Sequence, residues 1–338
     1  MIDGLTLSST CELSSFRSMP LSHTLLSSVA ATSFAVWVYL TVASRQFWRL
    51  PKTKLRRGYQ RGFSGERRGH YSSARRGRAD RKTLKSLVRQ DYSGLLQILV
   101  INDHSSDNTA EITLEVSRRF WTGVRVISSA PLPQGWTGKI WALFQGVQQA
   151  AELEPDYFFF SDADIVRQET SLTSLVAIAE CEGLDLISLM AKLESSTFAE
   201  RALLPAFLFY FFMLYPPNWV CSANHNTAAA AGGNVLVRSK ALARMGGIAA
   251  IRDELIDDCA LARKIKDLGR IQLGWAKDAR SLRRYGGFKE LGAMISRNAF
   301  YQLRHSISLL FAIIACLTYS LHPRCSLSLA GGVPLWLS

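Results

Sequence analysis

Residues 157–165 read YFFFSDADI, and this stretch says most about the fold. The aromatic run 157–161 is typical of a strand buried on both faces of a sheet. Two acids, Asp162 and Asp164, come directly after the run. Because ligands of open parallel sheets bind at the carboxyl ends of the strands, the stretch predicts a buried strand that ends at a binding site.

Short apolar runs alternate with amphipathic segments from Thr83 onward, a pattern typical of an α/β fold. The expected strands are residues 97–101, 124–127, 157–161 and 184–190. The expected helices are residues 107–119, 139–151 and 259–266. The polar residues at the strand ends are therefore the first candidates for a functional site.

The pair Asp162 and Asp164 has the spacing of a metal site, because two acids two residues apart at a strand end can share one hard cation. Mg²⁺ or Mn²⁺ held there would bridge the diphosphate of a sugar nucleotide and neutralise the charge of the leaving group. Phosphatases that form an aspartyl phosphate also use Asp-x-Asp, with Thr or Val two positions later. Val166 stands at that position, so the spacing leaves this class open.

Acids elsewhere in the chain are also candidates. Asp103 comes after the strand 97–101 and can accept the imide N–H of a uracil ring, whereas Asp107 is more typical of a helix cap. Asp257 and Asp258 precede a predicted helix, where either can be a cap. If that loop closes over a donor, one of the two can take the proton of an acceptor hydroxyl as general base.

Small residues and one lysine complete the candidate set. Residues 228–234 read AAAAGGN, so Gly232 and Gly233 lie where the backbone approaches a ligand closely or where it packs tightly. Lys139 comes after Trp-Thr-Gly and either contacts phosphate or faces solvent.

Two segments are candidates for membrane helices. Residues 24–44 are mostly apolar and uncharged, which suits one bilayer crossing, with a cleaved signal peptide as the alternative. Arg45 and the basic residues beyond it favour a cytoplasmic position for the rest of the chain. Residues 301–322 enclose a shorter apolar run, and residues 203–215 predict an interfacial or a buried helix.

The net charge of +13 is concentrated in residues 52–82, which hold 12 Lys and Arg residues against two acids. The stretch lacks helical or strand periodicity and is predicted to be disordered. It can be read as an arginine-glycine segment that binds RNA, as a patch attracted to anionic lipid, or as a stretch without an evolved role, which we favour. Because the rest of the chain is only weakly basic, we expect no nucleic-acid partner.

The cysteines are scattered singly, without the paired spacing of a zinc site or the density of a disulfide scaffold. A reducing compartment is the expected setting.

Together, these motifs resemble family 2 glycosyltransferases of the GT-A fold. The order is Gly-Lys-x-x-Ala-Leu, Asp-x-Asp, Gly-Gly and then a pair of acids, over residues 83–304. Longer strings look like the hopene-associated glycosyltransferases of bacterial hopanoid gene clusters. These strings are residues 135–143, 188–207, 228–238, 246–266 and 299–306.

The resemblance implies an α/β, GT-A-like (Rossmann-like) mixed sheet with helices on both faces, plus N-terminal and C-terminal membrane helices. It implies that Asp258 is the general base with Asp257 beside it, and that Asp164 and Asp162 hold Mg²⁺ or Mn²⁺. The candidate donor-binding residues are Asp103, Lys139, Asp162, Gly232, Gly233, Gln302 and Arg304.

The expected organisation combines these segments. Members of the family begin the domain with a strand and a Pro-Ala-Arg-Asn-Glu type loop, and here the arginine-rich stretch stands in their place. The expected parts are a tail (1–23), a transmembrane anchor (24–44), a basic disordered segment (45–82), the GT-A domain (83–300), an interfacial or membrane helix (301–322) and a second tail (323–338).

The expected function is inverting transfer of a sugar from a nucleotide-diphosphate donor, a UDP-sugar, to a hydroxyl of a lipid or hopanoid-type acceptor. The expected location is the bacterial inner membrane, with the catalytic domain facing the cytoplasm. The alternatives are an inactive membrane-tethered member of the family and an RNA-associated protein that acts through residues 52–82.

Overall fold

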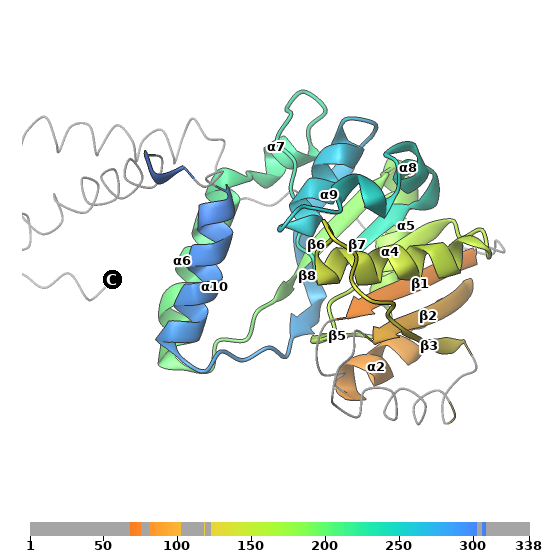
Figure 1. Cartoon of the computed structure of the whole chain (residues 1–338), viewed down its shortest axis with the longest axis horizontal. Coiled ribbons are helices and arrows are strands. Elements are labelled where there is room, and N and C mark those ends of the chain that lie inside the picture. The colour runs from red at the N-terminus through yellow and green to blue at the C-terminus, as the bar shows by residue number, and fades with distance from the viewer. Residues whose placement is uncertain (1–67, 76–80, 103–117, 119–122, 303–305, 309–338) are drawn as a thin grey trace, which may run out of the picture. The chain divides into compact units, whose positions relative to one another are not determined.

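The structure is a computed structural model and describes residues 68–75, 81–102, 118, 123–302 and 306–308. Within these residues the centre of the fold is an eight-stranded sheet, with the strand order β3-β2-β1-β4-β7-β6-β8-β5 (Figure 1). All of the helices and strands named below lie in one compact unit, Ser44–Ser306.

The strands are β1 (Arg68–Arg75), β2 (Leu95–Asn102), β3 (Val124–Ser128), β4 (Tyr157–Phe160), β5 (Ile165–Arg167), β6 (Leu186–Lys192), β7 (Val235–Arg238) and β8 (Ile271–Ser281). The helices are α2 (Arg81–Val88), α4 (Gly138–Ala151), α5 (Ser171–Glu182), α6 (Phe198–Leu214), α7 (Pro217–Cys221), α8 (Ser239–Arg244), the 3-10 turn η3 (Ile248–Ile251), α9 (Asp257–Lys266) and α10 (Phe288–Gln302). The four strands expected from the sequence are present as β2, β3, β4 and β6, and two of the expected helices as α4 and α9.

The sheet is mixed, as expected for a GT-A-like fold. Strands β3, β2, β1 and β4 run parallel, β7 pairs antiparallel with β4 and with β6, and β8 pairs parallel with β6. The carboxyl ends of these four parallel strands therefore lie at the same edge of the sheet, and the acids after β4 lie at this edge. The short strand β5 returns antiparallel to β8 directly after these acids.

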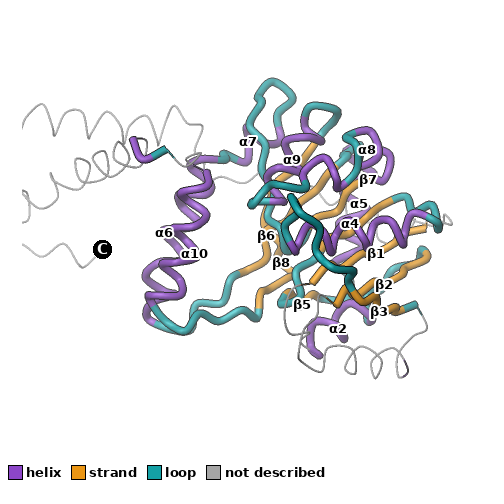
Figure 2. Tube along the Cα trace, viewed as in Figure 1, coloured by secondary structure: helices purple, strands orange, loops and turns teal. Residues whose placement is uncertain are grey.

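Helices cover both faces of the sheet (Figure 2). Ile98 and Val100 of β2 belong to one apolar cluster with α2 and α5. Leu99 and Ile101 alternate with them and are also buried, so they face the other side, where α4 contacts β1 and β2. Burial on both faces explains why β2 and β4 appear in the sequence as continuous apolar runs.

Strand β1 corrects the expectation that residues 45–82 are disordered. Residues 68–75 pair in parallel with β2 along their whole length, and residues 69–71 pair with β4 on the other side. A strand in this place satisfies the backbone N–H and C=O groups of two neighbours, and those bonds do not depend on side-chain type. Tertiary context therefore overrides the absence of periodicity. Residues 45–67 and 76–80 lie outside the described residues.

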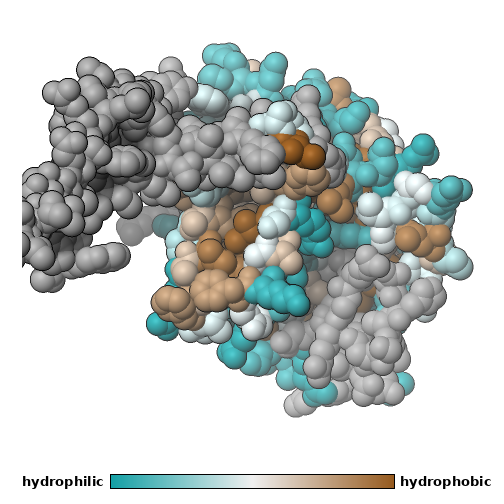
Figure 3. Space-filling view, turned by 60° about the vertical axis from the view of Figure 1, so that its left-hand side comes forward, coloured by the Kyte–Doolittle hydropathy of each residue, from teal (hydrophilic) through white to brown (hydrophobic). Residues whose placement is uncertain are grey.

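Helices α6 and α10 lie side by side, apart from the main layers (Figure 1). Leu204, Leu291 and Tyr285 are buried between them. Helix α6 contains most of residues 203–215, predicted to be interfacial or buried, and part of it is buried. Phe211 and Phe212 are buried, whereas Phe209 is 37% and Leu214 46% exposed. Figure 3 shows apolar side chains gathered on this part of the surface.

Among the described residues, no helix has the length and apolar character required to cross a bilayer. The predicted anchor at 24–44 lies outside the described residues. So does the predicted helix at 301–322, apart from its first two residues, which end α10, and residues 306–308. The predicted helix at 107–119 is described only at residue 118.

Candidate active site

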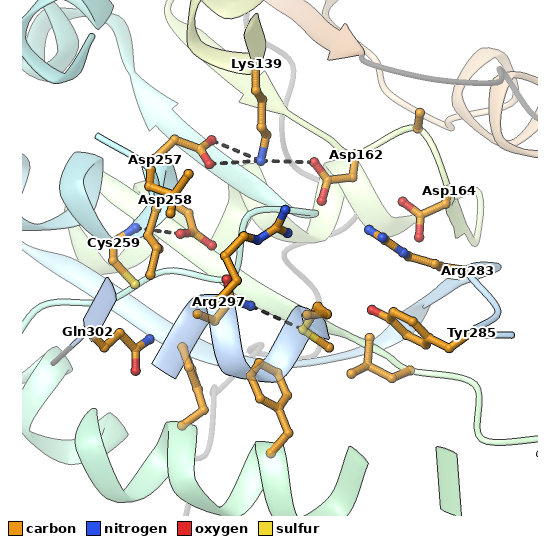
Figure 4. Close-up of a pocket in the computed structure, with 18 residues that line it drawn as sticks. Lys139, Asp162, Asp164, Asp257, Asp258, Cys259, Arg283, Tyr285, Arg297 and Gln302 are labelled. Atoms are coloured by element: carbon orange, nitrogen blue, oxygen red, sulfur yellow. Dashed lines mark hydrogen bonds and ion pairs between the residues drawn. The ribbon is translucent and has the colours of Figure 1, made fainter. Parts of the chain in front are cut away.

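A cavity of about 540 Å³ brings the predicted acids together (Figure 4). Asp162 and Asp164 reach it from the turn after β4, and Asp257 and Asp258 from the first turn of α9. Segments far apart in the sequence therefore line one cavity. Lys139, in the first turn of α4, and Gln302, the last residue of α10, also line it.

Lys139 lies between the two acidic segments. Its Nζ is 3.4 Å from Asp162 Oδ1 and 3.0 Å from Asp257 Oδ2, and it donates a hydrogen bond to Asp257 Oδ1 at 3.1 Å. Burial lowers the pKa of Lys139, but the charges of Asp162, Asp257 and Asp258 outweigh burial, so its pKa is raised overall. Lys139 is therefore a permanent ammonium group that links the turn after β4 to the start of α9, although its side chain is 36% exposed.

Asp258 is held by two backbone amides. The N–H of Gly232 donates to Oδ2 at 2.7 Å, and the N–H of Cys259 donates to Oδ1 at 2.8 Å. Burial, together with the neighbouring charge of Asp257, raises the pKa of Asp258 to about 6. A carboxylate with a pKa close to the working pH is suited to general-base catalysis.

The two glycines explain how the acids come close together. A Cβ at Gly232 would lie 3.0 Å from Asp258 Oδ2 and 3.2 Å from Lys139 Nζ. A Cβ at Gly233 would lie 3.0 Å from Ile165 Cγ1 and 3.6 Å from Asp162 Oδ2. Both predicted glycines therefore lie next to predicted acids. A side chain at Gly232 would crowd Asp258 and Lys139, whereas one at Gly233 would crowd Ile165.

Asp162 and Asp164 fit a divalent cation. Both side chains point into the cavity (Figure 4), and Ser281 Oγ donates a hydrogen bond that orients Asp164. No group of three or more His, Cys, Asp or Glu side chains is placed to hold a metal in the part of the chain that the structure describes. A cation here would thus take one or two carboxylates and complete its shell with phosphate and water oxygens, as Mg²⁺ does at nucleotide sites.

Comparison with protein families gives a match for the part of the chain that carries several of these site residues. Residues 81–246 match the family described as Glycosyl transferase family 2. Over residues 81–246 the chain is therefore similar to family 2 glycosyltransferases. The matched segment contains Lys139, the Asp162–Asp164 pair and both glycines. It ends before Asp257 and Asp258, which the fold brings to the same cavity.

One solved structure with a TM-score over 0.5 shows the same fold. The mannosyltransferase PcManGT from Pyrobaculum calidifontis, in complex with GDP-Man and Mn²⁺, is 14% identical with a TM-score of 0.55, covering 92% of this chain and 88% of its own. S. aureus TarS 1–349 with UDP-GlcNAc is 17% identical, with a TM-score of 0.44, and the match covers 69% of this chain and 66% of the TarS chain. Glucosyl-3-phosphoglycerate synthase from Mycobacterium tuberculosis, with Mn²⁺, UDP and glucosyl-3-phosphoglycerate, is 19% identical, with a TM-score of 0.40 and coverage of 69% and 77%. The comparison with curated proteins gave no match.

The segment after residue 246 also supplies cavity residues that the motifs did not reveal. Arg283 and Tyr285 come after β8 and line the cavity, and Arg297 reaches it from α10 (Figure 4). The signal for Arg283 was available, since polar residues after a strand end were the criterion used for the acids. Arg297 had no such signal, because it lies within a helix whose packing is not evident from the sequence.

Part of the cavity lining is apolar. It consists of residues from α6, α10 and the loop after β6, namely Leu193, Phe207, Phe211 and Met294. The cavity is therefore lined by both charged and apolar residues. Of the predicted site residues, Asp103 and Arg304 lie outside the described residues.

Proposed function

We propose that this protein transfers a sugar from a nucleoside diphosphate donor, a UDP-sugar, to a hydroxyl group, with inversion at the anomeric carbon. The family 2 domain supports a glycosyltransferase that uses a nucleotide sugar. The observation that carries the proposal is that Asp162, Asp164 and Asp258 share one cavity. A carboxylate pair suited to the donor diphosphate and a carboxylate suited to proton removal thus face the same volume.

In the proposed reaction, Asp258 accepts the proton of the acceptor hydroxyl. The hydroxyl oxygen attacks the anomeric carbon while the bond to the donor diphosphate breaks, and a single displacement inverts the configuration. Asp162 and Asp164 would hold Mg²⁺ or Mn²⁺, whose charge, when bound, neutralises the departing diphosphate. The ammonium group of Lys139 lies beside the same acids and adds positive charge on the leaving-group side.

PcManGT is the one structural neighbour named above with a TM-score over 0.5, and it was solved with GDP-Man and Mn²⁺. That pairing supports the proposed class of donor and cation. The choice of UDP over GDP rests on Asp103, which we expect to contact the base.

We further propose a lipid alcohol, of the hopanoid type, as the acceptor. The apolar part of the cavity lining suits an acceptor with an apolar body and a single reactive hydroxyl. The outward face of α6 supports delivery from a membrane surface. It consists of Phe198, Ala202, Pro205, Ala206 and Phe209, spaced as one helical stripe and all exposed. The expected location is the cytoplasmic face of the bacterial inner membrane.

The proposal is tested by incubating membranes that contain the full chain with labelled sugar nucleotides, both UDP- and GDP-linked, and then extracting lipid products. Transfer should need Mn²⁺ or Mg²⁺ and stop with EDTA. Asp164→Asn should abolish transfer, and Asp258→Asn should lower kcat by about 100-fold or more, the usual contribution of a general base.

Asp267→Asn is the matched control, because Asp267 is an exposed acid at the other end of α9. It should keep wild-type turnover. Unaltered turnover in both Asp164→Asn and Asp258→Asn would rule out the assignment. Calorimetry with a UDP-sugar and Mn²⁺ distinguishes an active enzyme from an inactive family member. The inactive protein should give no heat of binding.

A further inference from the structure

Arg167 is a buried cation next to the proposed metal site. It ends β5, three residues after Asp164, and is only 4% exposed. A buried guanidinium is costly unless its N–H groups are hydrogen-bonded, so its partners show what the site requires of it.

The partners of Arg167 lie on both sides of the Asp-x-Asp turn. The guanidinium donates a hydrogen bond to Ser161 Oγ, and Nη1 donates to the carbonyl of Ile165 at 3.3 Å. Ser161 directly precedes Asp162, and Ile165 comes directly after Asp164. The ring of Phe159, on β4, lies under the guanidinium at 4.9 Å. One side chain therefore anchors the turn before its first acid and after its second.

Arg167 also contacts the glycine segment. Nη2 donates to the carbonyl of Gly233 at 3.0 Å, and Nε donates to Asn234 Oδ1 at 3.5 Å. The neighbouring Gly232 donates its N–H to Asp258. Through two adjacent residues, Arg167 thus connects the turn that carries the carboxylate pair to the segment that holds the proposed base.

We propose that Arg167 is a positioning residue that fixes the Asp162–Asp164 turn against the Gly232–Gly233 segment and thereby sets the geometry of the cation site. This inference rests on the proposed function. The planar guanidinium suits the role because it donates in several fixed directions at once, whereas a lysine donates from one nitrogen. Arg167 itself does not touch the reacting atoms in this proposal.

The experiment is an electron paramagnetic resonance titration of the purified full chain with Mn²⁺, in the presence of UDP or GDP. Arg167→Gln should weaken Mn²⁺ binding by about 10-fold or more, the usual effect of removing a residue that orients metal ligands. Arg167→Lys should also weaken it, because one ammonium group cannot serve four separated acceptors. The Asp164→Asn variant gives the background, because any Mn²⁺ that it still binds lies elsewhere on the protein.

Arg238 provides the matched control. Its guanidinium also lies 4.9 Å from the ring of a β4 residue, Tyr157, but at the opposite end of that strand. Its carboxylate partners are Glu180 and Asp185, outside the cavity. Arg238→Gln should lower the melting temperature without changing the affinity for Mn²⁺.

The outcomes separate the two proposals. If wild type and Asp164→Asn bind Mn²⁺ equally, the proposed cation site fails, and the role of Arg167 fails with it. If wild type binds through Asp164 but Arg167→Gln and Arg167→Lys bind as tightly, only the role of Arg167 is overturned. Equal weakening in Arg238→Gln would also overturn it, since general destabilisation would then explain the loss. Should Arg167→Gln not fold, Arg167→Lys decides.

Discussion

Four carboxylates and three cationic side chains line the cavity, so its chemistry depends on which of these groups holds a proton. They are Asp162, Asp164, Asp257, Asp258, Lys139, Arg283 and Arg297. Lys139 stays charged because three acids surround it. Burial, with the neighbouring charge of Asp257, raises the pKa of Asp258 to about 6. The proton equilibrium of Asp258 should therefore control activity near neutral pH.

This argument gives a prediction for the dependence of kcat/KM on pH. A base acts only when deprotonated, so activity should be lost below pH about 6 and should level off above it. The charge of Asp257 contributes to the raised pKa, so Asp257→Asn should move the midpoint to lower pH. The measurement is a pH profile of sugar transfer at saturating Mn²⁺. A flat profile from pH about 5 to about 8 in the wild type would remove Asp258 as the base.

The acids and glycines of the site could be predicted from the sequence because each belongs to a short motif at a strand or helix end. Arg167 could not, since its role arises from partners spread from Ser161 to Asn234. Nor could Arg297, which reaches the cavity only because α10 packs beside α6. Motif spacing reveals residues that act within one turn of chain, whereas long-range packing decides the rest.

At the scale of elements, α6 has a well-defined start. Thr197 caps the helix, its side chain accepts from the N–H of Glu200, and Glu200 accepts from the N–H of Thr197 at 2.9 Å, which forms a capping box. Glu200 is fully buried and also accepts from the N–H of Tyr285 at 2.9 Å. One carboxylate thus joins α6 to the segment that leads into α10.

Glu200 should therefore make the protein sensitive to acid. The hydrogen bond from Tyr285 N–H, with those from Thr197 and Ser196, lowers the pKa of Glu200 from 4.5 to about 2. A lowered folded-state pKa stabilises the fold above the unfolded value of 4.5, and this stability is lost as pH falls toward 2. Glu200→Gln should reduce the melting temperature at neutral pH by a few degrees and flatten its decline below pH 4.5.

Thermal melts between pH about 2 and neutral pH provide the test. The control is Glu194→Gln, because Glu194 is partly exposed and forms a surface ion pair with Arg280 at 3.5 Å. It should melt as the wild type does at every pH. The assignment would be contradicted by an equal effect of the two substitutions.

Strands β2, β4 and β6 could be predicted because burial on both faces leaves apolar runs in the sequence. The shorter β3 was predicted as well, although only Val124 of it is buried. Strand β1 could not, since residues 68–75 are held by backbone pairing with β2 and β4 and carry no strand pattern. The pairing of α6 with α10 was also missed. Helix α6 is apolar around most of its circumference, which does not indicate which side is buried.

At the scale of the whole molecule, the same helix pair contributes to the cavity and to the surface. Phe207 and Phe211 of α6 line the cavity, whereas Phe198, 79% exposed, and Phe209 face outward. Phe288 of α10 is 54% exposed and packs edge-on against Phe198 at 6.0 Å. Exposed aromatic residues grouped on one element mark an interaction surface more often than single ones do. For a lipid acceptor, a surface next to the cavity shortens the path from the bilayer to Asp258.

A site-directed spin label can test this arrangement in the full chain reconstituted into vesicles that contain anionic lipid. With other reactive cysteines replaced, a label at Phe209→Cys should be more accessible to oxygen, which concentrates in hydrocarbon, than to a water-soluble nickel complex. The label at Leu132→Cys should show the reverse, because Leu132 is also apolar and 51% exposed but lies in the loop before α4. If both labels prefer the nickel complex, the outward face of α6 does not contact lipid. Delivery of the acceptor along α6 would then be wrong, while sugar transfer at Asp258 would stand on its own test.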